Sequence, residues 1–234
     1  MEQYKQDFIE FMVRSDVLTF GDFVTKSGRK TPFFINTGNY RTGTQIMKLG
    51  EFYRTAIKAA LSITTFSCPG VTPFILYGPA YKGIPLAVAT SIAFAREGID
   101  IPYCFNRKEA KDHGEGGKLI GANPDRSSTV LIIEDVVTAG TSARESMYLL
   151  TTVCGVTQFL GLMVSVDRME KGAGVDKSAL AQLKIDYGLA SFAIVNLDEI
   201  VEYLFGREID GRILIDAEIK KMIDNYRAQW GAER

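Results

Sequence analysis

The stretch Val130-Leu-Ile-Ile-Glu-Asp-Val-Val-Thr-Ala-Gly-Thr-Ser142 decides the fold of this chain of 234 residues. Its apolar half is continuous rather than alternating, which is typical of a strand covered on both faces of a parallel sheet. Two carboxylates, Glu134 and Asp135, end that run, and a Gly-containing turn leads into an amphipathic helix that begins at Ser142. The order of strand, acidic pair, turn and helix predicts a βαβ unit with polar groups at the carboxyl end of its strand.

The same residues suit a sugar phosphate. The two carboxylates can accept hydrogen bonds from vicinal ribose hydroxyls. The turn 138–141 offers backbone N–H groups and hydroxyls, and its Gly140 permits close approach or a positive φ. A helix N-terminus also favours an anion, and a plain N-cap at Thr141 or Ser142 is compatible with that role. The alternative is a solvated acidic pair that merely ends a strand.

Outward from this unit, strand and helix patterns alternate. Short apolar runs predict strands at 74–77, 101–105, 129–134, 159–166 and 192–196. Helical spacing of apolar residues predicts helices at 4–15, 45–62, 83–96, 142–153, 179–183, 197–204 and 217–230. The alternation predicts an α/β fold, a doubly wound, mostly parallel sheet with helices on both faces.

The first forty residues break this alternation. Two short strands, 17–25 and 32–36, flank the polar turn Lys26-Ser-Gly-Arg-Lys30. We expect residues 1–42 to form a small N-terminal hood on a single domain that spans 1–234, because no repeat or low-complexity linker divides the chain.

The composition excludes several classes of partner and location. A net charge of −1 gives no global field toward nucleic acid or an anionic membrane, so neither partner is expected. The cysteines Cys68, Cys104 and Cys154 form neither a disulfide framework nor a metal-ligand pattern, which favours a reducing compartment. The polar N-terminus does not look like a signal peptide, and the longest apolar segment, 84–95, is too short to span a bilayer. A cytoplasmic location is therefore expected.

The segment Arg107-Lys-Glu-Ala-Lys-Asp-His-Gly-Glu-Gly-Gly-Lys118 is densely charged and almost free of apolar side chains. It cannot pack into a core, so we expect a solvated, mobile loop. An ordinary exposed hairpin is one interpretation. Near the acidic pair, however, its cations and its histidine could cover a polyanionic leaving group.

Four segments together resemble the motifs of the orotate phosphoribosyltransferases. They are Glu134-Asp-Val-Val-Thr-Ala-Gly-Thr141, Phe105-Asn-Arg-Lys-Glu-Ala-Lys-Asp-His-Gly-Glu-Gly-Gly117, Gly78-Pro-Ala-Tyr-Lys-Gly83 and Lys26-Ser-Gly-Arg-Lys-Thr-Pro-Phe-Phe34. The first marks phosphoribosyltransferases in general, and the loop and the N-terminal motif narrow the resemblance to the orotate enzyme. The resemblance extends over essentially the whole chain.

The resemblance implies a glycosyltransferase (a pentosyltransferase) of de novo pyrimidine synthesis. Such an enzyme joins orotate to phosphoribosyl pyrophosphate (PRPP) and releases orotidine 5′-monophosphate and pyrophosphate. It implies Mg²⁺, held mainly by PRPP and water, because the sequence shows no protein metal cage. It also implies a homodimer in which a mobile catalytic lid, 107–121, reaches the neighbouring active site.

The resemblance also implies roles for particular residues. The catalytic residues would be Lys111, His113, Glu134 and Asp135. The carboxylates would hold the ribose hydroxyls and favour the positive charge of an oxocarbenium-like transition state. PRPP and pyrophosphate would contact these four residues and Lys26, Tyr81, Lys82, Arg107, Lys108, Val136, Val137, Thr138, Ala139, Gly140, Thr141 and Ser142. No proton acceptor is assigned, although Asp135 is a candidate, and Lys111 or His113 could assist the pyrophosphate.

Orotate is planar and carries a carboxylate, so it needs an aromatic face and a cation. The resemblance assigns it to Lys26, Phe34, Ile35, Thr138 and Arg168. The alternatives are core packing for Phe34 and a surface strand-end role for Arg168. The family often has a second aromatic residue where this chain has Ile35, so a stacking role is in doubt there and the backbone remains for binding. The acidic pair is Glu-Asp where some relatives have Asp-Asp.

Three other interpretations compete with this one. A phosphoribosyltransferase for a purine or uracil would share the turn 134–141 but should lack the 26–34 motif and the full lid. A noncatalytic PRPP-sensing regulator would lose the lid cations and often carry a nucleic-acid surface, yet no basic stripe stands out. A dinucleotide-binding oxidoreductase would need G-x-G-x-x-G after an early strand, and that pattern is missing.

Overall fold

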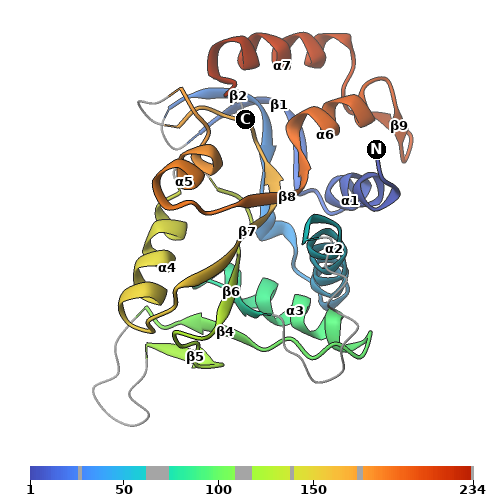
Figure 1. The fold of residues 1–234 in the computed structure, drawn as a ribbon. Coiled ribbons are helices and arrows are strands. Elements are labelled where there is room, and N and C mark those ends of the chain that lie inside the picture. Colours follow the sequence, from blue (N-terminus) through green and yellow to red (C-terminus); the bar gives the residue numbers. More distant parts are fainter. Residues whose placement is uncertain (26–27, 62–73, 109–117, 138–139, 173–175, 233–234) are drawn as a thin grey trace.

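The computed structural model describes residues 1–25, 28–61, 74–108, 118–137, 140–172 and 176–232. Within these residues the central sheet has six strands in the order β5-β4-β3-β6-β7-β8 (Figure 1). Their bounds are Leu119–Gly121 (β5), Tyr103–Asn106 (β4), Ile75–Tyr77 (β3), Thr129–Ile133 (β6), Gln158–Asp167 (β7) and Ser191–Asn196 (β8). Within the described part of this six-stranded sheet, only the β4–β5 pair is antiparallel, so the mostly parallel sheet is confirmed.

Helices cover both faces of this sheet, as predicted. One face carries α2 (Gly43–Leu61) and α3 (Gly83–Ala95), and the other carries α4 (Thr141–Thr152) and α5 (Ala179–Tyr187) (Figure 1). The side chains of β6 alternate between two apolar cores because successive residues of a strand point to opposite faces. Leu131 and Ile133 belong to one core, and Val130 and Ile132 to the other.

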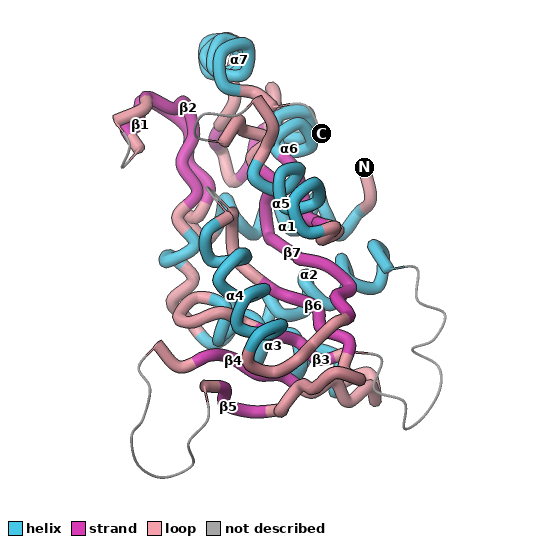
Figure 2. The backbone as a smooth tube through the Cα atoms, turned by 60° about the vertical axis from the view of Figure 1, so that its left-hand side comes forward, coloured by secondary structure: helices cyan, strands magenta, loops and turns pink. Residues whose placement is uncertain are grey.

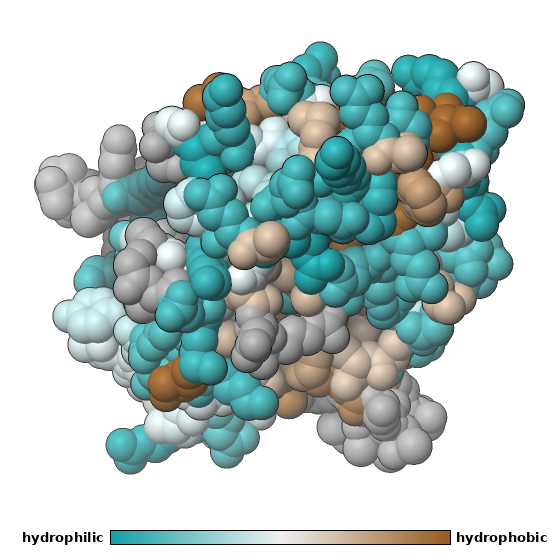
Figure 3. Space-filling model, turned by 90° about the horizontal axis from the view of Figure 1, so that it is seen from above, coloured by the Kyte–Doolittle hydropathy of each residue, from teal (hydrophilic) through white to brown (hydrophobic). Residues whose placement is uncertain are grey.

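The hairpin of β1 (Leu18–Val24) and β2 (Lys30–Ile35) is separate from the central sheet. It lies at one end of the molecule beside α7 (Ala217–Trp230), as Figures 1 and 2 show. Phe33 of β2 meets Tyr226 of α7 edge to face, with 5.8 Å between ring centroids. Seen from the α7 end, the surface is mainly hydrophilic (Figure 3).

The remaining helices pack against the main core. Helix α1 (Gln3–Arg14) contributes Phe8, Ile9 and Met12, and α6 (Leu197–Leu204) follows β8 directly. Thus the part of residues 1–42 that stands apart from the sheet is the hairpin, whereas α1 is part of the main body. Among the described residues, no helix combines the length and the apolar character that a membrane crossing needs.

The sequence patterns missed the short elements. These are β5, the two-stranded ribbon of β9 (Glu208–Ile209) and β10 (Arg212–Ile213), and the 3₁₀ helix η1 (Thr37–Asn39). Each has only two or three residues, too few to show a period. Helix α5 also runs beyond the predicted end at 183, to a C-cap at Gly188 with φ of 66°.

Candidate active site

Two loops meet beyond the carboxyl ends of β3 and β6. The first, 78–82, follows β3, and the second begins with Glu134 and Asp135 after β6. They are in direct contact, because Nζ of Lys82 lies 2.9 Å from Oδ2 of Asp135. This is the edge of a doubly wound sheet at which ligands bind.

The two carboxylates have different surroundings. The Asp135 carboxylate accepts hydrogen bonds at Oδ2 from Oγ1 of Thr37, at 2.6 Å, and from Nζ of Lys82. Glu134 is only 7% exposed, and its Oε1 has no hydrogen-bond partner among the described residues. Burial raises the pKa of Glu134 to about 7, and the nearby Ser142 hydroxyl offsets part of that rise. One acid is therefore paired, while the other has a buried oxygen without a hydrogen-bond partner among the described residues, which is a costly state for a polar group.

The loop after β3 is a tight turn that requires glycine at both ends. A Cβ at Gly78 would lie 2.1 Å from the carbonyl oxygen of Gly83, and one at Gly83 would lie 2.7 Å from the carbonyl carbon of Gly78. The Ala80 N–H donates to Oδ1 of Asn106, at 2.8 Å, which ties the turn to the end of β4. The turn therefore holds its last residue, Lys82, against the acidic pair.

The base of the predicted lid lies against the same turn. The Arg107 N–H donates to the carbonyl of Lys118, at 2.9 Å, which closes the neck of the loop. Nζ of Lys108 lies 4.9 Å from the centroid of the exposed Tyr81 ring. The structure thus brings Lys108 against the turn that carries Tyr81 and Lys82.

The turn after the acidic pair leads into α4. Val136 still bridges to Val166 of β7, and Gly140 adopts φ of 72° as the N-cap of α4, the positive φ that the sequence suggested. Thr141 and Ser142 form the first turn of the helix, where backbone N–H groups lack intrahelical partners. Lys26, Lys111, His113, Thr138 and Ala139 lie outside the described residues.

Phe34 and Ile35 end β2, just before the segment that carries Thr37. The Phe34 ring is 42% exposed and stacks on Phe23, with 5.7 Å between centroids, so the core-packing alternative for Phe34 is wrong. Ile35 is partly buried and packs against the main core.

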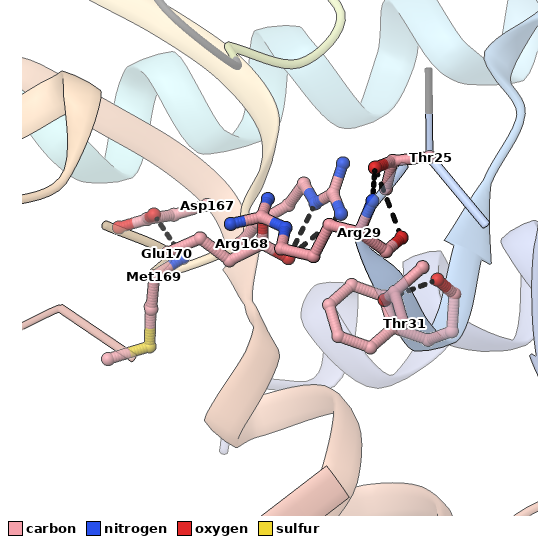
Figure 4. Close-up of polar contacts among 8 residues, drawn as sticks. Thr25, Arg29, Thr31, Asp167, Arg168, Met169 and Glu170 are labelled. Atoms are coloured by element: carbon pink, nitrogen blue, oxygen red, sulfur yellow. Dashed lines mark hydrogen bonds and ion pairs between the residues drawn. The ribbon is translucent and has the colours of Figure 1, made fainter. Parts of the chain in front are cut away.

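Arg168 lies beside Arg29, Glu170 and Asp167 (Figure 4). Nε and Nη2 of Arg168 donate to Oε1 of Glu170, at 3.2 and 2.8 Å. Nη2 of Arg29 donates to Oε2 of the same carboxylate, at 2.7 Å. The Arg168 guanidinium also lies 5.3 Å from the ring centroid of Phe33, so Arg168 is held in place rather than solvated. The two guanidinium groups share the Glu170 carboxylate, and Asp167 precedes Arg168 at the end of β7.

Several of these residues were missed by the sequence analysis. Arg29 lies inside the 26–34 motif, and Glu170 stands two positions after Arg168, so both could have been found. Thr37 belongs to the polar cluster Asn36-Thr-Gly-Asn39, directly after Ile35, for which the sequence analysis made no site prediction. Among the described residues, no group of three or more His, Cys, Asp or Glu side chains could hold a metal ion.

Comparison with known proteins places this geometry in a family. The model of the phosphoribosyl transferase domain matches residues 45–196. The orotate phosphoribosyltransferase of Clostridium botulinum (strain Alaska E43 / Type E3) is 51% identical over 234 residues, which is 100% of each chain. That of Clostridium beijerinckii is 52% identical with the same coverage. The crystal structure of the Francisella tularensis orotate phosphoribosyltransferase is 35% identical, with a TM-score of 0.79, and covers 97% of this chain and 100% of its own.

The raised pKa of Glu134 predicts a pH-dependent cost in the ligand-free protein. Between the ordinary value of 4.5 and about 7, the folded state keeps a proton that the unfolded state has lost, so stability falls as pH rises. Glu134→Gln removes this dependence. The variant should gain stability relative to the parent between pH 5 and pH 8, by up to about 3 kcal/mol, in urea unfolding. Glu202→Gln, at an exposed site on α6, is the control. A gain that is the same at both pH values would contradict the assignment.

Proposed function

The chain belongs to the phosphoribosyltransferases and, among them, to the orotate phosphoribosyltransferases, and on that premise we propose that it transfers the phosphoribosyl group of PRPP to orotate. The products would be orotidine 5′-monophosphate and pyrophosphate, and the reaction belongs to de novo pyrimidine synthesis. The observation that supports this site best is the buried Glu134 with its unpartnered oxygen, next to the paired Asp135.

The acidic pair would hold the ribose. A ribose hydroxyl that donates to Oε1 of Glu134 would supply the missing hydrogen bond and would favour the ionised carboxylate. As the bond from the anomeric carbon to pyrophosphate breaks, positive charge builds on the sugar. Two carboxylates in a partly dry site stabilise that charge more than they stabilise the neutral ground state.

The turn 136–142 would hold the 5′-phosphate. The N-terminus of α4 presents unpaired backbone N–H groups, and the positive φ of Gly140 turns the chain just before them. Thr138, Ala139, Thr141 and Ser142 would add hydroxyl and backbone donors.

The lid and the turn after β3 would receive the pyrophosphate. Lys82 is 64% exposed in its pair with Asp135, so the pair is weak and a polyanion can displace it at little cost. This exchange would free Asp135 for the ribose at the moment when Lys82 meets a phosphate. Tyr81, Arg107, Lys108, Lys111, His113 and Lys26 would complete the cationic cover.

Mg²⁺ fits this site as a partner of the substrate. The described side chains beside the turn offer two adjacent carboxylates but no third ligand, which suits an ion held mainly by PRPP oxygens and water. When bound, the ion would neutralise charge on the departing pyrophosphate.

Orotate would bind between the hairpin and the end of β7. Phe34 offers an exposed ring, and the guanidinium groups of Arg29 and Arg168 offer hydrogen-bond donors for the orotate carboxylate. The backbone of Ile35, with Lys26 and Thr138, would contact the rest of the ring.

A second copy of the chain would cover the groove between α2 and α3. This groove has a volume of about 410 Å³ and an apolar lining that includes Met47, Val88 and Ile92. Ile92 is 52% exposed, and an apolar surface of this kind is typical of a protein interface. We propose a homodimer in which the lid reaches the neighbouring active site, and a cytoplasmic location.

The direct test of the reaction is to mix purified protein with orotate, PRPP and Mg²⁺ and to follow the ultraviolet absorbance of orotate. We expect orotate to be consumed only when PRPP is present, with equal amounts of pyrophosphate formed. Turnover of uracil or hypoxanthine in place of orotate would reassign the base while leaving the PRPP site intact.

Lys111→Ala should lower turnover about a hundredfold, equivalent to about 3 kcal/mol, because its charge is proposed to meet pyrophosphate as the bond breaks. Orotate binding, measured by calorimetry, should stay within about twofold. Lys118→Ala removes an equal charge from the end of the same segment and serves as the control. Unchanged turnover of Lys111→Ala would remove this lysine from the catalytic residues.

Ile92→Glu should convert the dimer to a monomer, since it buries a charge in the proposed interface. Sedimentation should show the change, and turnover should fall because the lid loses its neighbour. Ile185→Glu, at a 59% exposed site on α5, should change neither. A dimer that persists in Ile92→Glu would place the interface elsewhere.

A further inference from the structure

We propose that Tyr53 and Ser165 are positioning residues whose hydroxyls hold the main-chain carbonyls of Glu134 and Asp135 and so fix where both carboxylates meet the ribose. Oη of Tyr53 donates to the carbonyl of Glu134 at 2.6 Å. Oγ of Ser165 donates to the carbonyl of Asp135 at 2.5 Å. The proposal rests on the proposed role of the acidic pair in binding PRPP.

These two contacts stand where the regular sheet stops. The pairing of β6 with β3 ends at Ile132, and its pairing with β7 ends at Ile133. The Glu134 N–H still donates to the carbonyl of Met163, at 3.0 Å. A regular parallel ladder would then pair the Ser165 N–H with the carbonyl of Glu134. The structure pairs it with the carbonyl of Asp135 instead, at 2.8 Å.

The carbonyl of Glu134 is therefore released from the ladder, and the Tyr53 hydroxyl takes the place of the strand donor. The carbonyl of Asp135 receives two donors from one residue, the N–H and the hydroxyl of Ser165. A held carbonyl oxygen fixes the plane of its peptide. Two consecutive held planes fix the backbone on both sides of Asp135, and with it the direction in which both acidic side chains leave the chain.

Both donors act on the backbone of the acidic pair. Tyr53 belongs to α2 and Ser165 to β7, and both side chains are buried. Burial raises the pKa of Tyr53 well above its ordinary value, so the hydroxyl keeps its proton and remains a donor. A displacement of the carboxylates by even about 1 Å would weaken their fit to the transition state.

The chain offers a matched control in Tyr40. Its hydroxyl is buried, but it has no hydrogen-bond partner among the described residues. Its ring stacks on Phe11, with 5.1 Å between centroids, and lines the same cavity as Tyr53. Tyr53→Phe and Tyr40→Phe therefore delete the same atom from two neighbouring buried rings, and only the first deletion touches the acidic pair.

The test compares steady-state kinetics of Tyr53→Phe, Ser165→Ala and Tyr40→Phe with the parent enzyme. We expect Tyr53→Phe and Ser165→Ala each to lower kcat/KM for PRPP about tenfold, which corresponds to one weakened charged contact. The KM for orotate should stay within about twofold, and Tyr40→Phe should change neither constant. Equal effects of Tyr53→Phe and Tyr40→Phe would overturn the proposal, since loss of packing alone would explain both.

A double-mutant cycle shows whether the hydroxyl acts through the carboxylate. In a Glu134→Gln background, Tyr53→Phe should cost less than about twofold in kcat/KM for PRPP, because the group that it positions is already altered. An undiminished tenfold loss there would show that Tyr53 acts by another route. If circular dichroism shows that Tyr53→Phe does not fold, the same double-mutant cycle is measured with Ser165→Ala and Asp135→Asn.

These outcomes are distinct from a failure of the proposed function. Full kcat/KM for PRPP in Glu134→Gln and Asp135→Asn would remove the acidic pair from the reaction, whatever Tyr53→Phe does. Turnover of a different base would leave the same cycle measurable with that base.

Discussion

The buried carboxylate of Glu134 at the end of β6 is the interaction on which the site depends. An apolar strand carries it into the protein interior, where burial raises its pKa to about 7 and no described residue pairs with Oε1. A polar group left in this state costs stability until a donor arrives. In this state the Glu134 carboxylate lowers stability in the ligand-free protein, and a sugar hydroxyl bound there would remove that cost. The local instability and the proposed binding therefore have the same origin.

Elsewhere the charged groups of the site are held in ion pairs until a ligand replaces a partner. Lys82 rests on Asp135, and Glu170 lies between Arg29 and Arg168. A chain with a net charge of −1 has no global attraction for the polyanion PRPP, so these local groups must provide it. The exposed lysine can leave its partner easily, whereas the arginines are held by the partly buried carboxylate of Glu170 and by aromatic rings. The Lys82–Asp135 pair therefore suits a site where a ligand replaces one partner. The rigid Arg29–Glu170–Arg168 cluster suits the recognition of a ligand of fixed shape.

The sequence predicted the features that depend on local periodicity. The continuous apolar run 130–133 indicated a strand covered on both faces, and its side chains do divide between two cores. It could not show contacts that join distant segments. Tyr53 has the spacing of a core residue in α2, and Ser165 lies in an apolar strand, yet they bond to residues 81 and 30 positions away. Strand β5 was not predicted from the sequence because three residues at a sheet edge are too few to show a period.

Thr37 joins the two halves of the site that the sequence treated separately. Strand β2 carries Phe34 and ends at Ile35, and η1 begins two residues later with Thr37, whose hydroxyl donates to Asp135. The hairpin is supported from behind by α7, where Arg29 stacks over Tyr226 and Trp230. Helix α7 thus supports the hairpin, and the hairpin leads into η1. Thr37 of η1 is hydrogen-bonded to Asp135, the carboxylate proposed to hold the ribose. The subsites for base and sugar are therefore not independent modules: a shift of the hairpin must either move Asp135 or break the Thr37 hydrogen bond.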